Sequence, residues 1–219
     1  GVLEEECRAH HKRFFTVQDK KRPYIILKWA ETSNGFIAPL AKIKARPVWI
    51  SNSYSQQLVH KWRSEEHAIL VGTNTVIQDN PMLNVRSWEG RNPIRIVLDR
   101  TARASVKSHV FDEKTKTILL TEGRSKQGRK NLVFEEIDFT KNVVYQICEV
   151  LQKYQIQSVV IEGGLQTLQS FIDAKVWDEA RIFIGENEFI QGIEAPKISG
   201  SNIEEVKIKN DRLKIMMND

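Results

Sequence analysis

The sequence predicts an α/β fold in three layers, with a mainly parallel central sheet and an antiparallel hairpin at its C-terminal end. Short, nearly continuous apolar runs alternate with segments of helical period along most of the 219 residues, as expected where helices cover both faces of a parallel sheet. Several of these runs end in glycine or a polar turn. The last two apolar segments instead alternate with polar residues around Asn210-Asp211-Arg212, which is typical of a hairpin with one solvated face.

The first 22 residues are set apart by their charge. An acidic run at residues 4–6 is followed by basic residues, which predicts a solvated helix. This segment reads as a leader or linker that joins the rest of the chain at Pro23. We therefore expect an N-terminal tail at residues 1–22 and one domain at residues 23–219.

Apolar runs of strand length form the predicted sheet. They are bounded by turn signals such as residues 32–35 and by the polar or proline-containing stretches 36–47 and 122–130, which we interpret as surface loops. The predicted strands cover residues 24–30, 67–72, 94–99, 117–121, 133–137, 158–161 and 179–185. The hairpin strands are centred on residues 206–209 and 213–216.

Apolar residues at helical spacing predict the covering helices. Ser51 or Ser53 can cap the first of them. Residues 73–81 form a short helical or looped stretch that Pro81 ends. The apolar faces of the three longer helices contain Tyr54, Leu58 and Trp62; Val143, Val144, Ile147, Val150, Leu151 and Tyr154; and Leu165, Leu168, Phe171 and Ile172.

Composition limits the classes of function. The net charge is +5, but the basic residues are scattered, which favours anionic small ligands over nucleic acid. No apolar run approaches the roughly 20 residues needed to cross a bilayer. Cys7 and Cys148 form no pair spacing, so a reducing, cytoplasmic compartment is expected. Cys7, His10 and His11 lack further ligands nearby, so we expect no metal.

The stretch from Ser158 to Leu165 carries the clearest functional signal. A β-branched run ends in Glu162-Gly163-Gly164 and a helix follows at once, which can bring backbone amides close to a phosphate. A tight structural turn would have the same composition. The G-x-G-x-x-G pattern is absent, so a dinucleotide would not be held in the Rossmann manner. Walker A, H-E-x-x-H, C-x-x-C and G-x-S-x-G motifs are also absent, which argues against most metallohydrolase and acyl-transfer chemistry.

Five segments in a fixed order make the hypothesis specific. They are residues 28–38 (KWAETSNGFIA), 67–72 (HAILVG), 75–81 (TVIQDNP), 83–86 (LNVR) and 160–164 (VIEGG). Together they resemble the C-terminal reductase domain of the bifunctional riboflavin biosynthesis deaminase/reductase, over about residues 23–217. The resemblance implies a dihydrofolate-reductase-like fold and NADPH-dependent reduction of 5-amino-6-(5-phosphoribosylamino)uracil. Relatives of this fold commonly dimerise, so a homodimer is expected.

The resemblance also implies a cofactor site and a substrate site. The cofactor residues are Trp49, Thr75, Asp79, Gly163, Gly164, Leu165, Gln166 and Thr167. The substrate residues are Arg63, Leu83, Arg86 and Glu162. A guanidinium holds phosphate bidentately, which favours the two arginines as phosphate anchors. The implied step is hydride transfer from the nicotinamide C4 to C1′ of the opened, imine-like ribose, with Glu162, a substrate phosphate or water as the proton source.

These residues have structural alternatives as well. Arg63 suits a solvated helix end, Glu162 a turn cap, Asp79 a turn stabiliser and Trp49 a core position. Lys28 lies in an otherwise apolar strand, so its charge must emerge at a strand end or in a site.

The chain departs from the family pattern in several places. Asn34-Gly35 replaces the usual Asp-Gly turn, and Pro47 replaces a side-chain donor to the substrate. Arg100 and Arg103 are candidates for the cofactor 2′-phosphate on charge alone. Residues 1–15 look like the tail of a preceding deaminase domain, but the H-x-E and P-C-x-x-C signature is missing, so no deaminase activity is expected from this chain.

Two other functions remain open at this point. One is a reductase of the same fold that acts on a pteridine or folate. The other is a non-catalytic nucleotide-binding module.

Overall fold

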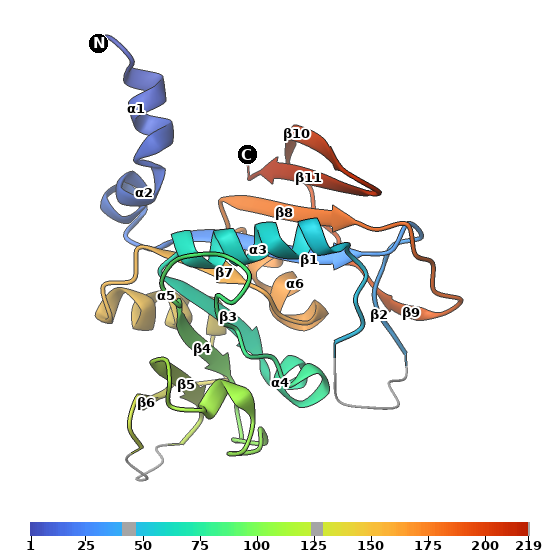
Figure 1. Cartoon of the computed structure of the whole chain (residues 1–219). Coiled ribbons are helices and arrows are strands. Elements are labelled where there is room, and N and C mark those ends of the chain that lie inside the picture. The colour runs from blue at the N-terminus through green and yellow to red at the C-terminus, as the bar shows by residue number, and fades with distance from the viewer. Residues whose placement is uncertain (41–46, 124–128, 219) are drawn as a thin grey trace.

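The chain, seen as a computed structural model that describes residues 1–40, 47–123 and 129–218, folds into three layers (Figure 1). Its elements are α1 (Glu4–His10), α2 (Lys12–Lys20), β1 (Tyr24–Glu31), β2 (Phe36–Pro39), α3 (Ser53–Glu65), β3 (Ala68–Gly72), α4 (Thr73–Asp79), β4 (Ile94–Leu98), the 3-10 helix η1 (His109–Phe111), β5 (Thr117–Thr121), β6 (Leu132–Glu136), α5 (Val143–Lys153), β7 (Ser158–Ile161), α6 (Leu165–Asp173), β8 (Glu179–Ile184), β9 (Gly192–Glu194), β10 (Ser201–Ile208) and β11 (Asp211–Met217).

Within the described residues, the central sheet has the strand order β10-β11-β8-β1-β7-β3-β4-β5-β6. All neighbours from β8 to β6 are parallel, whereas β11 runs antiparallel to both β8 and β10. The predicted α/β fold, mainly parallel sheet and C-terminal hairpin are therefore confirmed. The seven predicted parallel strands are also confirmed, with ends shifted by at most one residue.

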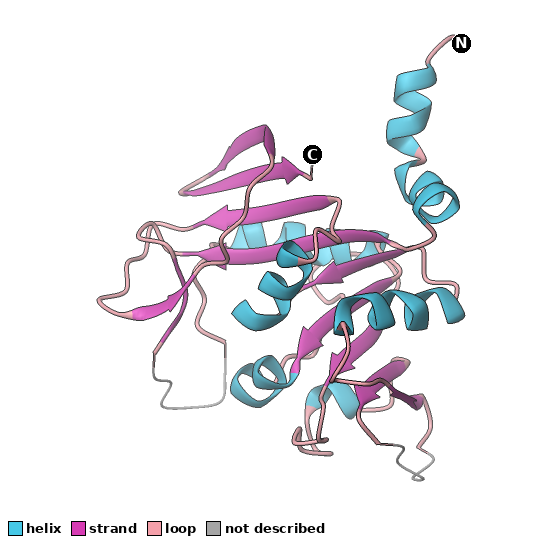
Figure 2. Cartoon of the chain, turned by 180° about the vertical axis from the view of Figure 1, so that it is seen from behind, coloured by secondary structure: helices cyan, strands magenta, loops and turns pink. Residues whose placement is uncertain are grey.

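Both faces of the sheet are covered, which explains the uninterrupted apolar runs. Leu70 packs in the core on the side of α5 and α6, whereas its neighbours Ile69 and Val71 pack on the opposite side with Val76 of α4. Helix α3 covers the sheet beside β8 on that second side, with Trp62 against Phe183. Figure 2 shows α5 and α6 in front of the sheet, on the face turned away in Figure 1. Each fully buried aliphatic side chain stabilises this arrangement by about 1.5–3 kcal/mol.

Two predictions about the N-terminal half of the domain were wrong in detail. The expected loop at 36–47 contains β2, which pairs antiparallel with β9 in a small second sheet. This pairing joins segments about 155 residues apart and leaves no local signal. The cap of α3 is Asn52, not Ser51 or Ser53: its Oδ1 accepts hydrogen bonds from the backbone N–H groups of Tyr54 and Ser55.

Residues 124–128 of the loop expected at 122–130 lie outside the described residues. The remaining predicted helices are found as α4, α5 and α6. Across the described ranges, no helix has the length and apolar character that a bilayer crossing requires.

The N-terminal helices differ in how they relate to the domain. Helix α1 has no buried residue and stands away from the rest of the molecule (Figure 1). Helix α2 is fastened by ion pairs: Lys12 to Glu179 at 2.7 Å, Lys20 to Asp178 at 2.8 Å, and Arg13 to Glu66, whose side chain is fully buried. Of the two helices in residues 1–22, only α1 is therefore the solvated helix that the charge pattern predicted.

Candidate active site

The turn after β7 brings two strand ends together. The backbone N–H of Glu162 donates to Leu70 O at 2.9 Å, which ties the end of β7 to β3. A Cβ on Gly163 would lie 2.9 Å from Thr167 Cβ, and one on Gly72 would lie 2.6 Å from Thr167 Oγ1. Glycine is required at both positions because the β3–α4 and β7–α6 turns pack against Thr167. Gly164 then caps α6 without a side chain, which leaves the amides of the helix N-terminus open to a ligand.

Two cavities of about 450 and 470 Å³ meet beside this turn. We call them the first and second cavities. The first extends toward Arg63, Leu83 and Arg86, and the second extends along Gly163, Gly164 and Leu165. The residues that line both are Lys28, Pro47, Trp49, Ser51, Thr75, Asp79 and Glu162. The cleft can therefore hold two ligands that touch at a shared border.

The border is organised by a nearly buried charge cluster. Arg63 donates from Nε and Nη2 to the two oxygens of Glu162, at 3.0 and 2.7 Å. Lys28 Nζ lies 3.8 Å from Glu162 Oε2. The side chains of Arg63 and Glu162 are each 11% exposed, so the ion pair is only partly screened by solvent.

The protonation states in this cluster follow from the same contacts. Burial raises the pKa of Glu162, but the charges of Arg63 and Lys28 and the Arg63 hydrogen bonds outweigh it and lower the pKa to about 2. Burial lowers the pKa of the Lys28 ammonium, and the Glu162 carboxylate partly opposes that shift. These contacts favour the charged carboxylate form of Glu162, which argues against the proton-donor role considered for it. A role as hydrogen-bond acceptor and counter-charge remains.

Helix α3 and the connection before β4 form the far wall of the first cavity. Leu83 is buried and has a left-handed backbone with φ of 49°. Arg63 Nη1 donates to Asn84 O at 3.3 Å, and the backbone N–H of Arg86 donates to His60 Nδ1 at 3.3 Å. The Arg86 side chain is exposed, and its Nη1 donates to Asn84 Oδ1 at 3.1 Å. In the described part of the chain, no ion pair engages Arg86, so its guanidinium can meet a ligand.

The structure brings most of the predicted site residues to the cleft. Those that line it are Arg63, Leu83, Arg86, Glu162, Trp49, Thr75, Asp79, Gly163, Gly164 and Leu165. Gln166 and Thr167 do not line either cavity; Gln166 is exposed, and Thr167 is buried beneath the glycine turn. The core alternative for Trp49 is wrong, because its side chain is 54% exposed.

One departure from the family pattern, the turn at Asn34-Gly35, has a physical explanation. The Asn34 amide donates to Phe189 O at 2.8 Å, a contact that an aspartate could not make, and Gly35 has a φ of 83°. Arg100 is engaged by Glu122 at 3.0 and 2.9 Å. Arg103 Nη2 instead lies 3.4 Å from Oδ1 of Asn74, which lines the second cavity.

Several lining residues were not predicted. They include Asn74, Gln78, Gln56, His60 and His109. His60 lies one turn before Arg63 on the same face of α3, so its helical spacing from Arg63 was the one available signal. Among the described residues, no group of three or more His, Cys, Asp or Glu side chains is arranged to hold a metal ion.

The fold is dihydrofolate-reductase-like. The structure of dihydrofolate reductase from Enterococcus faecalis has the same fold, with a TM-score of 0.51 at 16% identity over 90% of this chain and 97% of that one. Residues 23–209 match the model of the RibD C-terminal domain. The chain therefore belongs to the RibD C-terminal domain family.

Individual relatives agree with this assignment. The riboflavin biosynthesis protein RibD of Aquifex aeolicus is 32% identical over 97% of this chain and 60% of its own length. The 2,5-diamino-6-ribosylamino-4(3H)-pyrimidinone 5′-phosphate reductase of Archaeoglobus fulgidus is 26% identical over 81% of this chain and 86% of its own. The deaminase/5-amino-6-(5-phosphoribosylamino)uracil reductase structure from Thermotoga maritima has a TM-score of 0.88 and 31% identity, over 100% of this chain and 63% of that one. This chain thus spans about 60% of the Aquifex and Thermotoga proteins.

Proposed function

We propose that this chain reduces the ribosyl group of 5-amino-6-(5-phosphoribosylamino)uracil to the ribityl product, with NADPH as the reductant. The observation that carries the proposal is the two-part cleft. Its first cavity presents arginines, its second cavity ends at an open helix N-terminus, and Lys28 and Glu162 lie where the two meet. The names of the Archaeoglobus and Thermotoga relatives support a phosphorylated ribosylamino-pyrimidine as the substrate.

The residues fit a nicotinamide dinucleotide on physical grounds. Gly164 lines the second cavity and caps α6 without a side chain, and the amides at the start of α6 can bind the negative charge of a diphosphate. Trp49 offers an exposed ring at the border of the two cavities. NADPH, when bound, supplies the hydride. The chain's own residues hold the two ligands in contact and exclude water from the border.

The carbon that accepts the hydride is expected to be C1′ of the opened, imine-like ribose. Glu162 can accept hydrogen bonds from sugar hydroxyls or a pyrimidine N–H, and it keeps positive charge on Arg63 and Lys28 beside the reacting atoms. The ammonium of Lys28 is a proton-bearing group at this border and replaces Glu162 as the proposed proton source.

The proposal is tested by substrate-dependent loss of NADPH absorbance. Both the deaminated and the undeaminated pyrimidine should be offered, each with NADPH and with NADH. Turnover of a pteridine or folate in preference to both would support the other reductase hypothesis. Tight binding of NADPH, followed by tryptophan fluorescence, with no turnover of any of these substrates would indicate a non-catalytic module.

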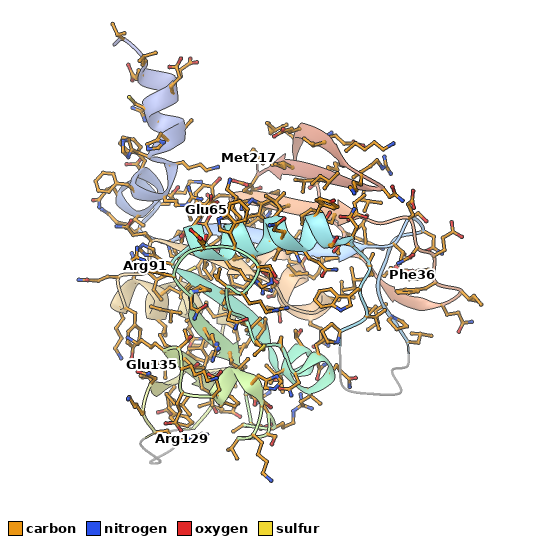
Figure 3. All side chains as sticks on the ribbon, viewed as in Figure 1. Phe36, Glu65, Arg91, Arg129, Glu135 and Met217 are labelled. Carbon is orange, nitrogen blue, oxygen red and sulfur yellow. The ribbon has the colours of Figure 1, made fainter. Side chains whose placement is uncertain are left out.

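Arg86→Ala should raise the KM of the phosphorylated substrate by about 10-fold to 100-fold and change kcat little, because the guanidinium contributes binding rather than chemistry. The control is Arg91→Ala, an exposed arginine of the same connection that does not line the first cavity (Figure 3). Equal KM values for the two variants would remove Arg86 from the phosphate site.

We assign recognition of the cofactor 2′-phosphate to Arg103, because Arg100 is already paired with Glu122 and Arg103 reaches Asn74 beside the second cavity. Arg103→Ala should weaken NADPH binding by about 10-fold and leave NADH binding unchanged. Arg100→Ala is the matched control. If Arg100→Ala weakened NADPH binding and Arg103→Ala did not, Arg100 would be the residue that recognises the 2′-phosphate.

The expected homodimer and cytoplasmic location stay part of the proposal. The outer edge of β10 supports a dimer, since Ile203 and Val206 are exposed on a strand at the edge of the sheet. Sedimentation velocity on the wild-type chain and on Ile203→Lys tests it: a monomer at micromolar wild-type concentration would contradict the dimer.

A further inference from the structure

His60 is a polar side chain in a position that packing alone does not explain. It lies on the buried face of α3, is 4% exposed, and still lines the first cavity. An apolar residue would fill the same space without the cost of desolvating an imidazole. The contact that offsets this cost is the hydrogen bond that Nδ1 accepts from the backbone N–H of Arg86.

The connection that carries Arg86 depends on α3 for its shape. Between α4 and β4 it contains no helix or strand in the described structure, and Leu83 adopts a left-handed backbone that is unfavourable for a branched side chain. Helix α3 holds it at two points one turn apart: His60 at the amide of Arg86, and Arg63 at the carbonyl of Asn84. The position of the Arg86 backbone limits where its guanidinium can lie, and Asn84 Oδ1 accepts a hydrogen bond from that guanidinium at 3.1 Å.

The charges around His60 keep it in the form that this contact requires. Burial and the neighbouring cations Arg63 and Arg86 lower the pKa of the imidazole to about 4, against weaker opposing effects of Glu162 and the Asn84 backbone. A neutral imidazole with its proton on Nε2 has an acceptor at Nδ1, whereas a protonated ring has none. The neutral tautomer with its proton on Nε2 therefore supplies the acceptor that this contact requires.

We propose that His60 is a positioning residue for substrate recognition, which aims Arg86 into the first cavity by accepting its backbone N–H. The identity of the anion that Arg86 meets, a substrate phosphate, rests on the proposed function. The positioning itself rests only on the contacts between α3 and the connection.

Three substitutions separate the acceptor from simple space filling. His60→Asn keeps a carbonyl oxygen near the place of Nδ1, His60→Gln moves it to the place of Nε2, and His60→Leu removes it. The KM of the phosphorylated substrate should rise about 10-fold in the Leu and Gln variants, with kcat within about 3-fold of wild type, and His60→Asn should recover most of the loss. Added to Arg86→Ala, His60→Leu should cause no further rise.

Binding of ribose 5-phosphate, measured by calorimetry, gives a readout that needs no turnover. The affinity should fall about 10-fold in His60→Gln and recover in His60→Asn. Ribose without phosphate should bind equally to the wild type and to all the variants. Equal effects of Asn and Gln, or effects additive with Arg86→Ala, would overturn the inference. If the wild type binds ribose 5-phosphate but reduces neither pyrimidine, the proposed function fails and the role of His60 is still decided by these binding values. Should His60→Leu not fold, the contrast between Asn and Gln decides alone.

Discussion

Glu162→Gln is expected to lower kcat by at least about 100-fold while the protein stays folded. Glutamine keeps the shape of the side chain and one acceptor for Arg63, but it removes the charge that balances Arg63 and Lys28 at the border of the two cavities. Electrostatic groups aimed at the reacting atoms are typically worth this much in turnover. Substrate-dependent NADPH oxidation measures the loss, and NADPH binding with circular dichroism checks the fold.

The pH dependence of the same variant tests the proton source. Because the pKa of Glu162 is about 2, its carboxylate is charged throughout the assay range, so it contributes no limb to the kcat profile near neutral pH. The Glu162 charge raises the pKa of Lys28; its removal therefore lowers that pKa, and an alkaline limb due to Lys28 should move to lower pH. An unmoved limb would exclude Lys28 as the donor.

The matched control is Glu65→Gln at the end of α3. Glu65 is an exposed carboxylate that pairs with Lys61 at 3.4 Å and lines neither cavity; it is labelled in Figure 3. It should retain wild-type turnover, since exposed pairs contribute little. Near-normal turnover of Glu162→Gln would remove Glu162 from the catalytic machinery.

Arg13→Ala is expected to destabilise the domain by about 3 kcal/mol, or roughly 6–12 °C in Tm for a chain of this size. Glu66 has a fully buried side chain, and Arg13 Nε donates to its Oε2 at 2.7 Å. The remaining cation, Arg181, lies 3.8 Å from Glu66 and is also bound to Glu179. Removing Arg13 thus leaves a buried carboxylate only partly compensated.

Thermal unfolding of Arg13→Ala and Arg8→Ala measures the effect against a control. Arg8 pairs with Glu4 on α1, where both side chains are largely exposed, so its loss should leave the Tm nearly unchanged. A large difference would indicate that the folded unit begins at α2 rather than at Pro23. Equal Tm values for Arg13→Ala and Arg8→Ala would indicate that residues 12–22 are part of the linker that the charge pattern predicted.

Short sequence patterns predict those features of the fold that depend on a few consecutive residues. The strand at 117–121 was predicted with its bounds because a strand covered on both faces must be apolar throughout. The turn at Glu162-Gly163-Gly164 was predictable because a strand-length apolar run, two glycines and a helical pattern follow one another directly, and Gly163 packs closely against Thr167. Arg63, Arg86 and Asp79 depended on the resemblance of five ordered segments, since each alone has an ordinary structural alternative.

Other features were decided by contacts between distant segments. Asn52 caps α3 in preference to two serines because its own amide also donates to Ile208 O and its backbone N–H to Asp211 in the hairpin. The pairing of β2 with β9 and the ion pairs of α2 likewise join residues that lie far apart in the chain. The role of His60 appears only when the connection before β4 is seen folded against α3.

The sequence by itself therefore determined the α/β class, the order of the parallel strands along the chain and the glycine turn after β7. These depend on burial and backbone geometry over a few consecutive residues. Only the tertiary structure decided that the pKa of Glu162 is lowered, because that pKa reflects the competition between burial and the charges of Arg63 and Lys28. Those three side chains come from three different elements, and their distances follow from the packing of the sheet and α3.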